Sequence, residues 1–314
     1  MRRFTGIFHF PNDQSLKRLG SFSFSARKTK ATAMQTSTKS NEPPGSIAEF
    51  ARLASRYSDR PEYPKQMVDH INSLLSLVPV GYPAVDIGAG TGLFTRPLAR
   101  SLNPSRSVIG IEPSAEMRRA AEDHPEKLEN VRYITGFAEE VGYASRSVAL
   151  VAAACAAHRF DKHTFLAESH RILVPHGCLA IVEYRWGDTQ NNVGDEIYSL
   201  LERLVDGYDR RAHSNSAGEY ELFDAADAIS SARLFTNVHQ RAFNWTVQRR
   251  TEEVISAAMA LTPSLKAEAK IGRETLWQAL EEVIARHSSS ADTVELNYVG
   301  HGTFALKRAS EARD

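Results

Sequence analysis

The sequence lacks the features of a membrane-spanning, disulfide-rich or strongly charged protein. Its two cysteines, Cys155 and Cys178, cannot build a disulfide framework and lack the spacing of a metal site. The longest apolar run, from Val148 to Ala157, is far shorter than the ~20 residues that span a bilayer. The 38 basic and 38 acidic residues cancel, so no net charge attracts nucleic acid or an anionic membrane. We therefore expect two reduced core thiols, no metal, no membrane span and no nucleic-acid partner.

What the sequence does contain is a globular composition with a basic beginning. Its 314 residues are 42% hydrophobic and 24% charged, which allows one large or two small domains. Residues 1–40 hold eight Lys and Arg, many Ser and Thr, and one acid, Asp13. This composition predicts a transit peptide that directs the chain to a mitochondrion or plastid; the alternative is a disordered basic tail on a cytoplasmic protein. We assign residues 1–45 to this segment and residues 46–314 to the folded domain.

Apolar strands alternate with amphipathic helices through the first half of the folded part. The expected strands cover residues 84–87, 107–111, 131–135, 148–154 and 178–183. Helices are expected between them, with Ser114 and Asp161 as caps. Because parallel strands need crossover connections, this order predicts an α/β fold with a Rossmann-like, mostly parallel sheet and helices on both faces.

The second half of the chain has a different pattern. Residues 186–235 are expected to form a small helical cap inserted into the domain. A strand over 238–247 and helices over 251–261 and 264–287 follow. Two further apolar runs flank Gly300-His-Gly302 and predict a late antiparallel hairpin, which makes a seven-stranded mixed sheet.

A glycine-rich turn follows the first strand. Gly88, Gly90 and Gly92 alternate with other residues, which lets the backbone turn tightly and bring bare amides against a ligand. Asp86, at the end of the strand, would repel a phosphate and attract an ammonium group. Glu112 ends the next strand, where an acid can accept hydrogen bonds from two ribose hydroxyls. The spacing indicates a nucleoside with a positively charged tail.

A dinucleotide is disfavoured because its motif needs a glycine at position 93, which is Leu93 here. The stretch resembles the cofactor motif of class I S-adenosylmethionine-dependent methyltransferases of the type 11 family, over about residues 50–308. The resemblance implies S-adenosylmethionine as cofactor, with Gly88 and Gly90 near its methionine part. It also implies that Asp86 lies near the amino group and that Glu112 holds the ribose.

The same resemblance assigns an adenine pocket. Gly136-Phe-Ala-Glu139 matches the end of the third strand, so Phe137 and Ala138 are candidates for adenine contacts. Ala154, which ends the fourth strand, is a further candidate for the cofactor pocket. For Phe137 the alternative is packing in the core.

Two motifs narrow the resemblance. Tyr57-Ser-Asp-Arg60-Pro-Glu-Tyr63-Pro64 and Ala156-Ala-His158-Arg159-Phe160-Asp161 are similar to segments of small-molecule enzymes such as trans-aconitate methyltransferase. Tyr57, Arg60 and Tyr63 would form a lid over the cofactor, and Trp186 could line the acceptor side. Arg159 replaces the tryptophan usual in this branch, and we hypothesise that it binds a substrate carboxylate. The alternative is a surface arginine.

His158 is the candidate catalytic base, because a histidine at the carboxyl end of the fourth strand lies where open α/β sheets bind ligands. Its alternative is a hydrogen bond to the backbone. The resemblance implies an enzyme that moves the sulfonium methyl to a small molecule, such as a carboxylate or thiol-bearing metabolite. Alternatives are C-methylation of a quinone precursor, or a non-catalytic cofactor-binding assembly factor. We expect a monomer or homodimer.

Overall fold

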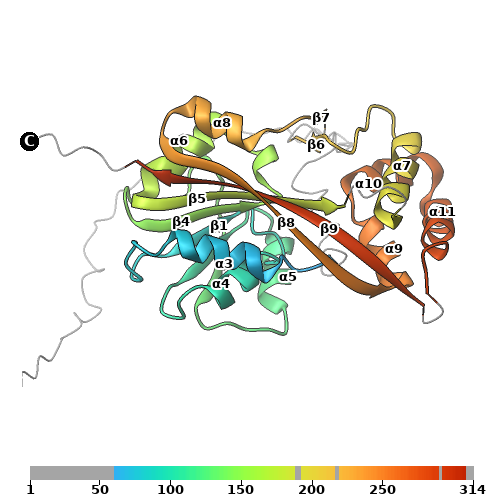
Figure 1. Cartoon of the computed structure of the whole chain (residues 1–314), viewed down its shortest axis with the longest axis horizontal. Helices are drawn as coiled ribbons and strands as arrows, with labels where there is room; N and C mark the ends of the chain where they lie inside the picture. The colour runs from blue at the N-terminus through green and yellow to red at the C-terminus, as the bar shows by residue number, and fades with distance from the viewer. Residues whose placement is uncertain (1–59, 188–191, 216–218, 290–291, 309–314) are drawn as a thin grey trace, which may run out of the picture. The chain divides into compact units, whose positions relative to one another are not determined.

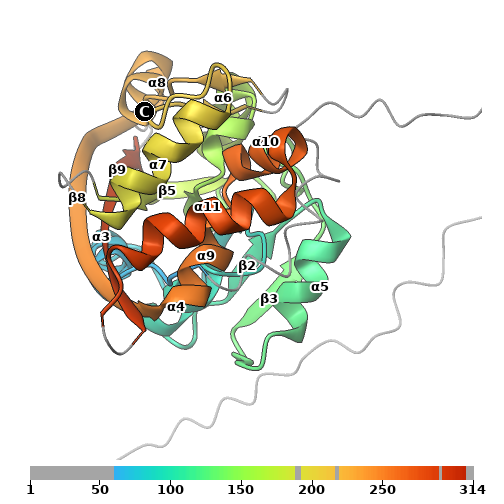
Figure 2. The same ribbon diagram turned by 90° about the vertical axis from the view of Figure 1, so that its right-hand side faces the viewer.

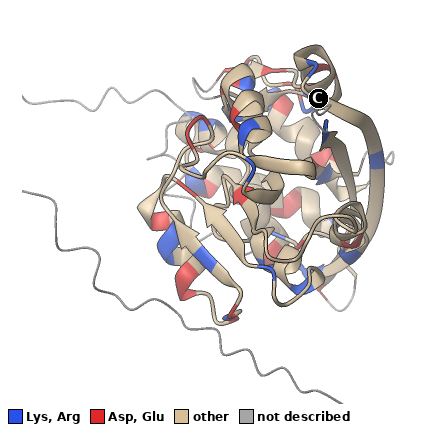
Figure 3. Ribbon diagram, turned by 90° about the vertical axis from the view of Figure 1, so that its left-hand side faces the viewer, with Lys and Arg blue, Asp and Glu red and all other residues tan. Residues whose placement is uncertain are grey.

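The computed structural model describes residues 60–187, 192–215, 219–289 and 292–308, all of which belong to one compact unit. The expected transit peptide and Tyr57 therefore lie outside the described residues. Within the described part of the chain, no helix is both long and apolar enough to cross a membrane. Basic and acidic residues are interspersed over the described elements (Figure 3).

A single seven-stranded sheet organises this unit, in the order β3-β2-β1-β4-β5-β9-β8 (Figure 1). The first five strands are parallel, β9 runs antiparallel to β5, and β8 runs antiparallel to β9. The predicted Rossmann-like mixed sheet is therefore confirmed. The strands are β1 (Ala84–Ile87), β2 (Val108–Ile111), β3 (Val131–Ile134), β4 (Val148–Ala154), β5 (Leu173–Trp186), β8 (Phe235–Arg250) and β9 (Thr293–Lys307).

Helices cover both faces of the sheet, as the alternating pattern predicts. The residues of β1 are buried and alternate between the two faces, so that Ala84 packs in one apolar cluster and Val85 in the other. The first cluster includes α3 (Lys65–Leu74) and α4 (Thr95–Ser101), and the second includes α6 (Lys162–Ile172) and α8 (Ala225–Ala232) (Figure 1).

Two helices begin where their capping residues predict. Ser114 caps α5 (Ala115–Asp123) by accepting a hydrogen bond from the backbone N–H of Met117. Asp161 caps α6 in the same way by accepting one from Thr164. Both caps start helices that run back from the edge of the sheet where the carboxyl ends of its parallel strands lie.

A third apolar cluster lies beyond the sheet and forms a helical cap. It joins α7 (Val193–Leu204), α9 (Thr251–Met259), α10 (Thr262–Ile271) and α11 (Arg273–Ala285) to the outer halves of β8 and β9 (Figure 2). A short hairpin of β6 (His213–Ser214) and β7 (Tyr220–Glu221) lies between α7 and α8. The cap therefore contains one helix that precedes β8 in the sequence, α7, and three that follow it, α9, α10 and α11. Helix α8 packs against the sheet instead. The domain boundaries stay a prediction.

Glycines account for two differences from the predicted elements. Gly300 and Gly302 lie inside one continuous strand, β9, so no hairpin forms there; the antiparallel partner of β9 is β8, which three helices separate from it in the sequence. A Cβ on Gly300 would lie 2.7 Å from the end of Met67, so this glycine permits close packing rather than a turn. Gly272 adopts a φ of 84° and divides the predicted helix over 264–287 into α10 and α11.

Candidate functional site

The turn after β1 uses its three glycines in different ways. Gly88, Gly90 and Gly92 all have positive φ, a conformation that favours glycine. A Cβ on Gly88 would lie 2.6 Å from the Cβ of Ala156, whereas one on Gly90 would meet nothing within 4 Å. A Cβ on Gly92 would collide with the hydroxyl of Tyr133. Gly88 and Gly90 line a cavity and Gly92 does not, so Gly92 serves the packing of the turn against β3.

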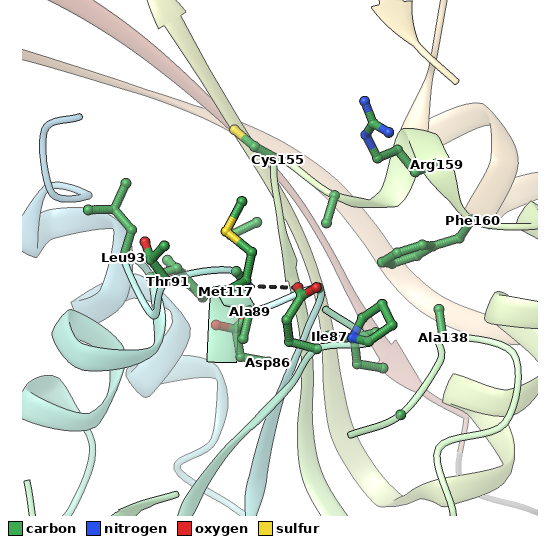
Figure 4. A pocket seen from close by; sticks show the side chains of 18 of the residues that line it. Asp86, Ile87, Ala89, Thr91, Leu93, Met117, Ala138, Cys155, Arg159 and Phe160 are labelled. Carbon is green, nitrogen blue, oxygen red and sulfur yellow. Dashed lines mark hydrogen bonds between the residues drawn. The ribbon is translucent and has the colours of Figure 1, made fainter. Parts of the chain in front are cut away.

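A cavity of about 460 Å³ opens at the carboxyl ends of β1, β2 and β4 (Figure 4). Its size and place are those of a small-molecule site at the edge of an open α/β sheet. The cavity brings together most of the residues predicted to bind cofactor or substrate. Those that line it are Arg60, Tyr63, Asp86, Gly88, Gly90, Glu112, Phe137, Ala138, Ala154 and Arg159.

Asp86 is a fully buried carboxyl group at the base of the cavity. Its Oδ2 accepts a 2.6 Å hydrogen bond from the Thr95 hydroxyl, and its Oδ1 is buried without a hydrogen bond. Burial raises the pKa of Asp86 to about 7, the Thr95 hydrogen bond opposes the rise, and the charge of Glu112 adds to it. Asp86 lines the cavity and has an acceptor oxygen without a hydrogen bond, which is compatible with the predicted contact with a cationic ligand group.

Glu112 is held in place from both sides by the backbone. Its Oε2 accepts a 2.9 Å hydrogen bond from the N–H of Gly90, and its Oε1 accepts one of 2.9 Å from the N–H of Ser114. Burial raises the pKa of Glu112, although these two hydrogen bonds oppose the rise. Each oxygen keeps further lone-pair capacity for a hydroxyl donor. The predicted contact with a ribose diol is compatible with this geometry.

One end of the cavity is largely apolar. Pro113, Met117, Phe137 and Ala138 line it together with Gly136, where a Cβ would lie 2.7 Å from Cγ2 of Ile111. Phe137 is 55% exposed, so it does not pack in the core. An exposed aromatic ring at the mouth of an apolar cleft can stack on a flat base. The predicted adenine pocket therefore has suitable walls.

The opposite end of the cavity combines aromatic rings with cations. Tyr63 is buried, and its ring packs edge-on against the rings of Phe94 and Tyr184. The ring centroids are 4.9 Å apart in each pair. Arg60 donates a 2.8 Å hydrogen bond to the carbonyl of Ala260, which follows α9 in the cap. Cys155 and Arg159 complete this end, which we call the acceptor end (Figure 4).

Cys155 has a left-handed backbone conformation, with a φ of 49°, directly after β4. Such a conformation is uncommon for a non-glycine residue and costs free energy, and it occurs often at functional sites. Burial raises the pKa of the Cys155 thiol, and burial likewise raises that of Tyr63. Both groups are therefore protonated at neutral pH. No residue pattern around Cys155 predicts this backbone conformation.

Two predicted site residues point elsewhere. His158, on the short 3-10 helix η1 (Ala157–Arg159), does not line the cavity, and its ring faces Glu183 and His213. Trp186 is buried in the cap cluster against Tyr198, with a ring separation of 5.8 Å. A catalytic base at His158 and an acceptor contact at Trp186 stay predictions without a cavity contact to support them.

Comparisons with known proteins agree with this arrangement. Residues 85–181 match the family described as methyltransferase domain. A Dictyostelium discoideum protein named as a methyltransferase is 39% identical over 109 residues, which are 35% of this chain and 39% of that protein. A demethylmenaquinone methyltransferase of Chlorobaculum tepidum is 33% identical over 160 residues, which are 50% of this chain and 63% of that protein.

This chain therefore spans less than two thirds of the length of both relatives. A solved structure from Anaeromyxobacter dehalogenans, named as a type II methyltransferase, has the same fold. It matches with a TM-score of 0.56 at 20% identity, over 79% of this chain and 97% of that one. The chain therefore contains a methyltransferase domain over residues 85–181 and has the Rossmann-like methyltransferase fold.

Proposed function

We propose that the chain binds S-adenosylmethionine in the cavity and methylates the carboxylate or thiolate of a small molecule. The observation that carries the cofactor part is the pairing of Asp86 and Glu112 at one edge of the sheet. The buried Oδ1 of Asp86 offers an acceptor for the ammonium group, and Glu112 offers acceptors for the ribose. The apolar end with Phe137 would take the adenine.

The acceptor end supports a nucleophile that is already ionised. The described lining of the cavity holds no histidine, and its acids are Asp86, Glu112 and Glu139, of which we assign the first two to the cofactor. Tyr63 and Cys155 have raised pKa values, so neither is ionised enough to take a proton at neutral pH. A carboxylate or thiolate needs no base, and the guanidinium groups of Arg60 and Arg159 would attract it.

The bound cofactor supplies an electrophilic methyl group on a positively charged sulfur. The protein then has to orient the acceptor in line with that group and exclude water. Orientation alone can lower the activation free energy by ~7–11 kcal/mol. Tyr63, wedged between Phe94 and Tyr184, forms a rigid wall for this purpose. The enclosure at the acceptor end thus replaces a catalytic base in our proposal.

A second candidate function is C-methylation of a quinone precursor, which the similarity to a demethylmenaquinone methyltransferase favours. A carbon acceptor has to lose a proton during the reaction, so it calls for a base near the methyl group. In our proposal the cofactor occupies Asp86 and Glu112, and Glu139 accepts a hydrogen bond from the backbone of Asp161, so no base is assigned to the acceptor and a carboxylate or thiolate is favoured.

The two functions can be separated with methyl-labelled S-adenosylmethionine and pools of small carboxylic acids, thiols and quinone precursors. A methyl ester loses its label as methanol in mild base, whereas a thioether or C-methyl product retains it. We expect transfer to acids or thiols. Transfer to quinone precursors alone would contradict the proposal, and cofactor binding without transfer to any pool would indicate a non-catalytic protein.

The acceptor contact of Arg159 can be tested once a substrate is found. Arg159→Ala removes a charged hydrogen-bond donor, which is worth ~1.5–3 kcal/mol, so KM for the acceptor should rise about 10- to 150-fold. Arg132→Ala, at an exposed position on β3, is the matched control and should leave KM unchanged. An unchanged KM in Arg159→Ala would remove Arg159 from the acceptor site.

A further inference from the structure

Three potential metal ligands meet beside the cofactor cavity although they are distant in the sequence. His158 comes from η1, Glu183 from β5 and His213 from β6, and we call them the His-Glu-His cluster. Nδ1 of His158 lies 3.5 Å from Oε1 of Glu183, and Nε2 of His213 lies 3.2 Å from its Oε2. One ligand atom from each residue lies within 4.8 Å of the other two. The fold thus gathers two imidazoles around one carboxylate.

Two of the polar atoms in this cluster are buried without a hydrogen bond. They are Nδ1 of His158 and Oε1 of Glu183, and the side chain of His158 is only 11% exposed. Leaving buried polar atoms unsatisfied costs free energy, so native proteins usually provide a partner for each. The two atoms face each other, which means that one cation between them would satisfy both.

We propose that the His-Glu-His cluster binds a divalent transition metal ion, with zinc as the best match. Zinc sites with an open position commonly use three protein ligands, and two histidines with one glutamate are a known set. Ligand atoms ~2.1 Å from a metal at tetrahedral angles lie ~3.4 Å apart. The 3.5 Å separation of His158 from Oε1 of Glu183 and the 3.2 Å separation of His213 from Oε2 are close to this spacing, and one ligand atom from each residue lies within 4.8 Å of the others, so a small side-chain adjustment would complete the site.

The two arginines nearest in sequence to His213 are paired with carboxylates, Arg210 with Asp195 and Glu202, and Arg211 with Asp209. Glu183 and His213 line a second, more polar cavity of about 400 Å³. The fourth position on the metal can therefore be filled by water or an anionic group from this cavity.

The site would connect the short hairpin of β6 and β7 to the cofactor cavity. His158 and Glu183 each precede a residue that lines that cavity, Arg159 and Tyr184. A metal on the cluster would fix both neighbours and hold β6 against η1. This proposal does not depend on the chemistry at the cofactor cavity, so metal binding and cofactor binding can be measured separately.

The test uses the full chain, stripped with a chelator and titrated with Zn²⁺ or Co²⁺. We expect one ion per chain, and for Co²⁺ the intense visible absorption of a tetrahedral site with nitrogen ligands. His213→Asn and Glu183→Gln each remove a ligand. Losing an outer-shell partner already costs 10- to 100-fold in affinity, so the loss of a ligand should cost at least about 100-fold. Binding of S-adenosylmethionine by the variants reports whether they are folded.

His176→Asn is the matched control, because His176 is exposed and has a positive φ that asparagine tolerates. It should bind metal as the wild type does. No stoichiometric binding by the wild type, or equal binding by the ligand variants, would overturn the proposal and leave the cluster as a hydrogen-bonded structural unit. If a variant does not fold, the wild type can be tested instead by modification of histidine with diethyl pyrocarbonate. Zinc should protect His213 from this modification, and absence of protection would refute the site.

Discussion

The affinity for S-adenosylmethionine should depend on pH through Asp86. In the free protein, burial raises the pKa of this group to about 7, whereas an ammonium group beside it would favour the carboxylate. Below pH 7 the cofactor must displace a proton, so affinity should fall about tenfold per pH unit. Above pH 8 the amino group of the cofactor itself loses its charge, since α-amino groups titrate at ~7.7–8.0. The affinity should therefore be highest between about pH 7 and 8.

Calorimetry in two buffers with different ionisation heats measures both the affinity and the protons released. At pH 6 we expect close to one proton released per cofactor bound and an affinity about tenfold below the maximum. Asp86→Asn should abolish the acid limb, whereas Glu112→Gln should retain it at lower affinity. An acid limb that is absent in the wild type, or unchanged in Asp86→Asn, would refute the role of Asp86 as the partner of the ammonium group.

The same raised pKa predicts how stability depends on pH. The pKa of Asp86 rises from 3.8 to about 7 on folding, so between these values the folded state holds a proton that the unfolded state has lost. Stability is then fully present below about pH 4 and falls as pH rises to 7. The loss is on the order of 4 kcal/mol for such a shift. Asp86→Asn should unfold at higher denaturant concentration than wild type at pH 8 and not at pH 4.

Two substitutions test the rest of the cofactor cavity. Glu112→Gln should weaken S-adenosylmethionine binding about 30- to 150-fold in calorimetry, because charged hydrogen bonds of ~2–3 kcal/mol are lost. The control Glu122→Gln, at an exposed position on α5, should leave the affinity unchanged. Equal affinities of the two variants would contradict the ribose contact. Gly88→Ala should lower the free energy of unfolding by about 2 kcal/mol or more, because a Cβ there meets both a positive φ and a close neighbour. Gly81→Ala is the control, because a Cβ there meets nothing within 4 Å, and it should unfold at the wild-type denaturant concentration. If Gly88→Ala also unfolded at that concentration, the turn would tolerate a side chain at position 88 and the prediction would be wrong.

The sequence predicted best those features that are encoded locally. The apolar run of β1, the glycine turn after it and the capping residue of α5 each lie within a few residues, and the structure places them as expected. The sequence also predicted that Asp86 and Glu112 lie near each other, because the carboxyl ends of parallel strands meet at one edge of a sheet. The structure places both in one cavity. Local periodicity and strand direction suffice for this part of the site.

Features that depend on distant neighbours could not be predicted in this way. Gly92 has the same local signal as Gly88, and only the approach of Tyr133 from β3 separates their roles. Gly300 looks like a turn residue until the packing of Met67 against it is known. The partners of His158 lie on β5 and β6, far along the chain, so the sequence could not predict the His-Glu-His cluster.

The central claim is that the cavity at the carboxyl ends of β1 and β2 recognises a sulfonium nucleoside. Equilibrium titration of the purified chain at pH 7.5 with S-adenosylmethionine, and separately with NAD, tests it directly. The account predicts saturable binding of one S-adenosylmethionine per chain and no measurable binding of NAD. Binding of NAD with no response to S-adenosylmethionine would contradict it.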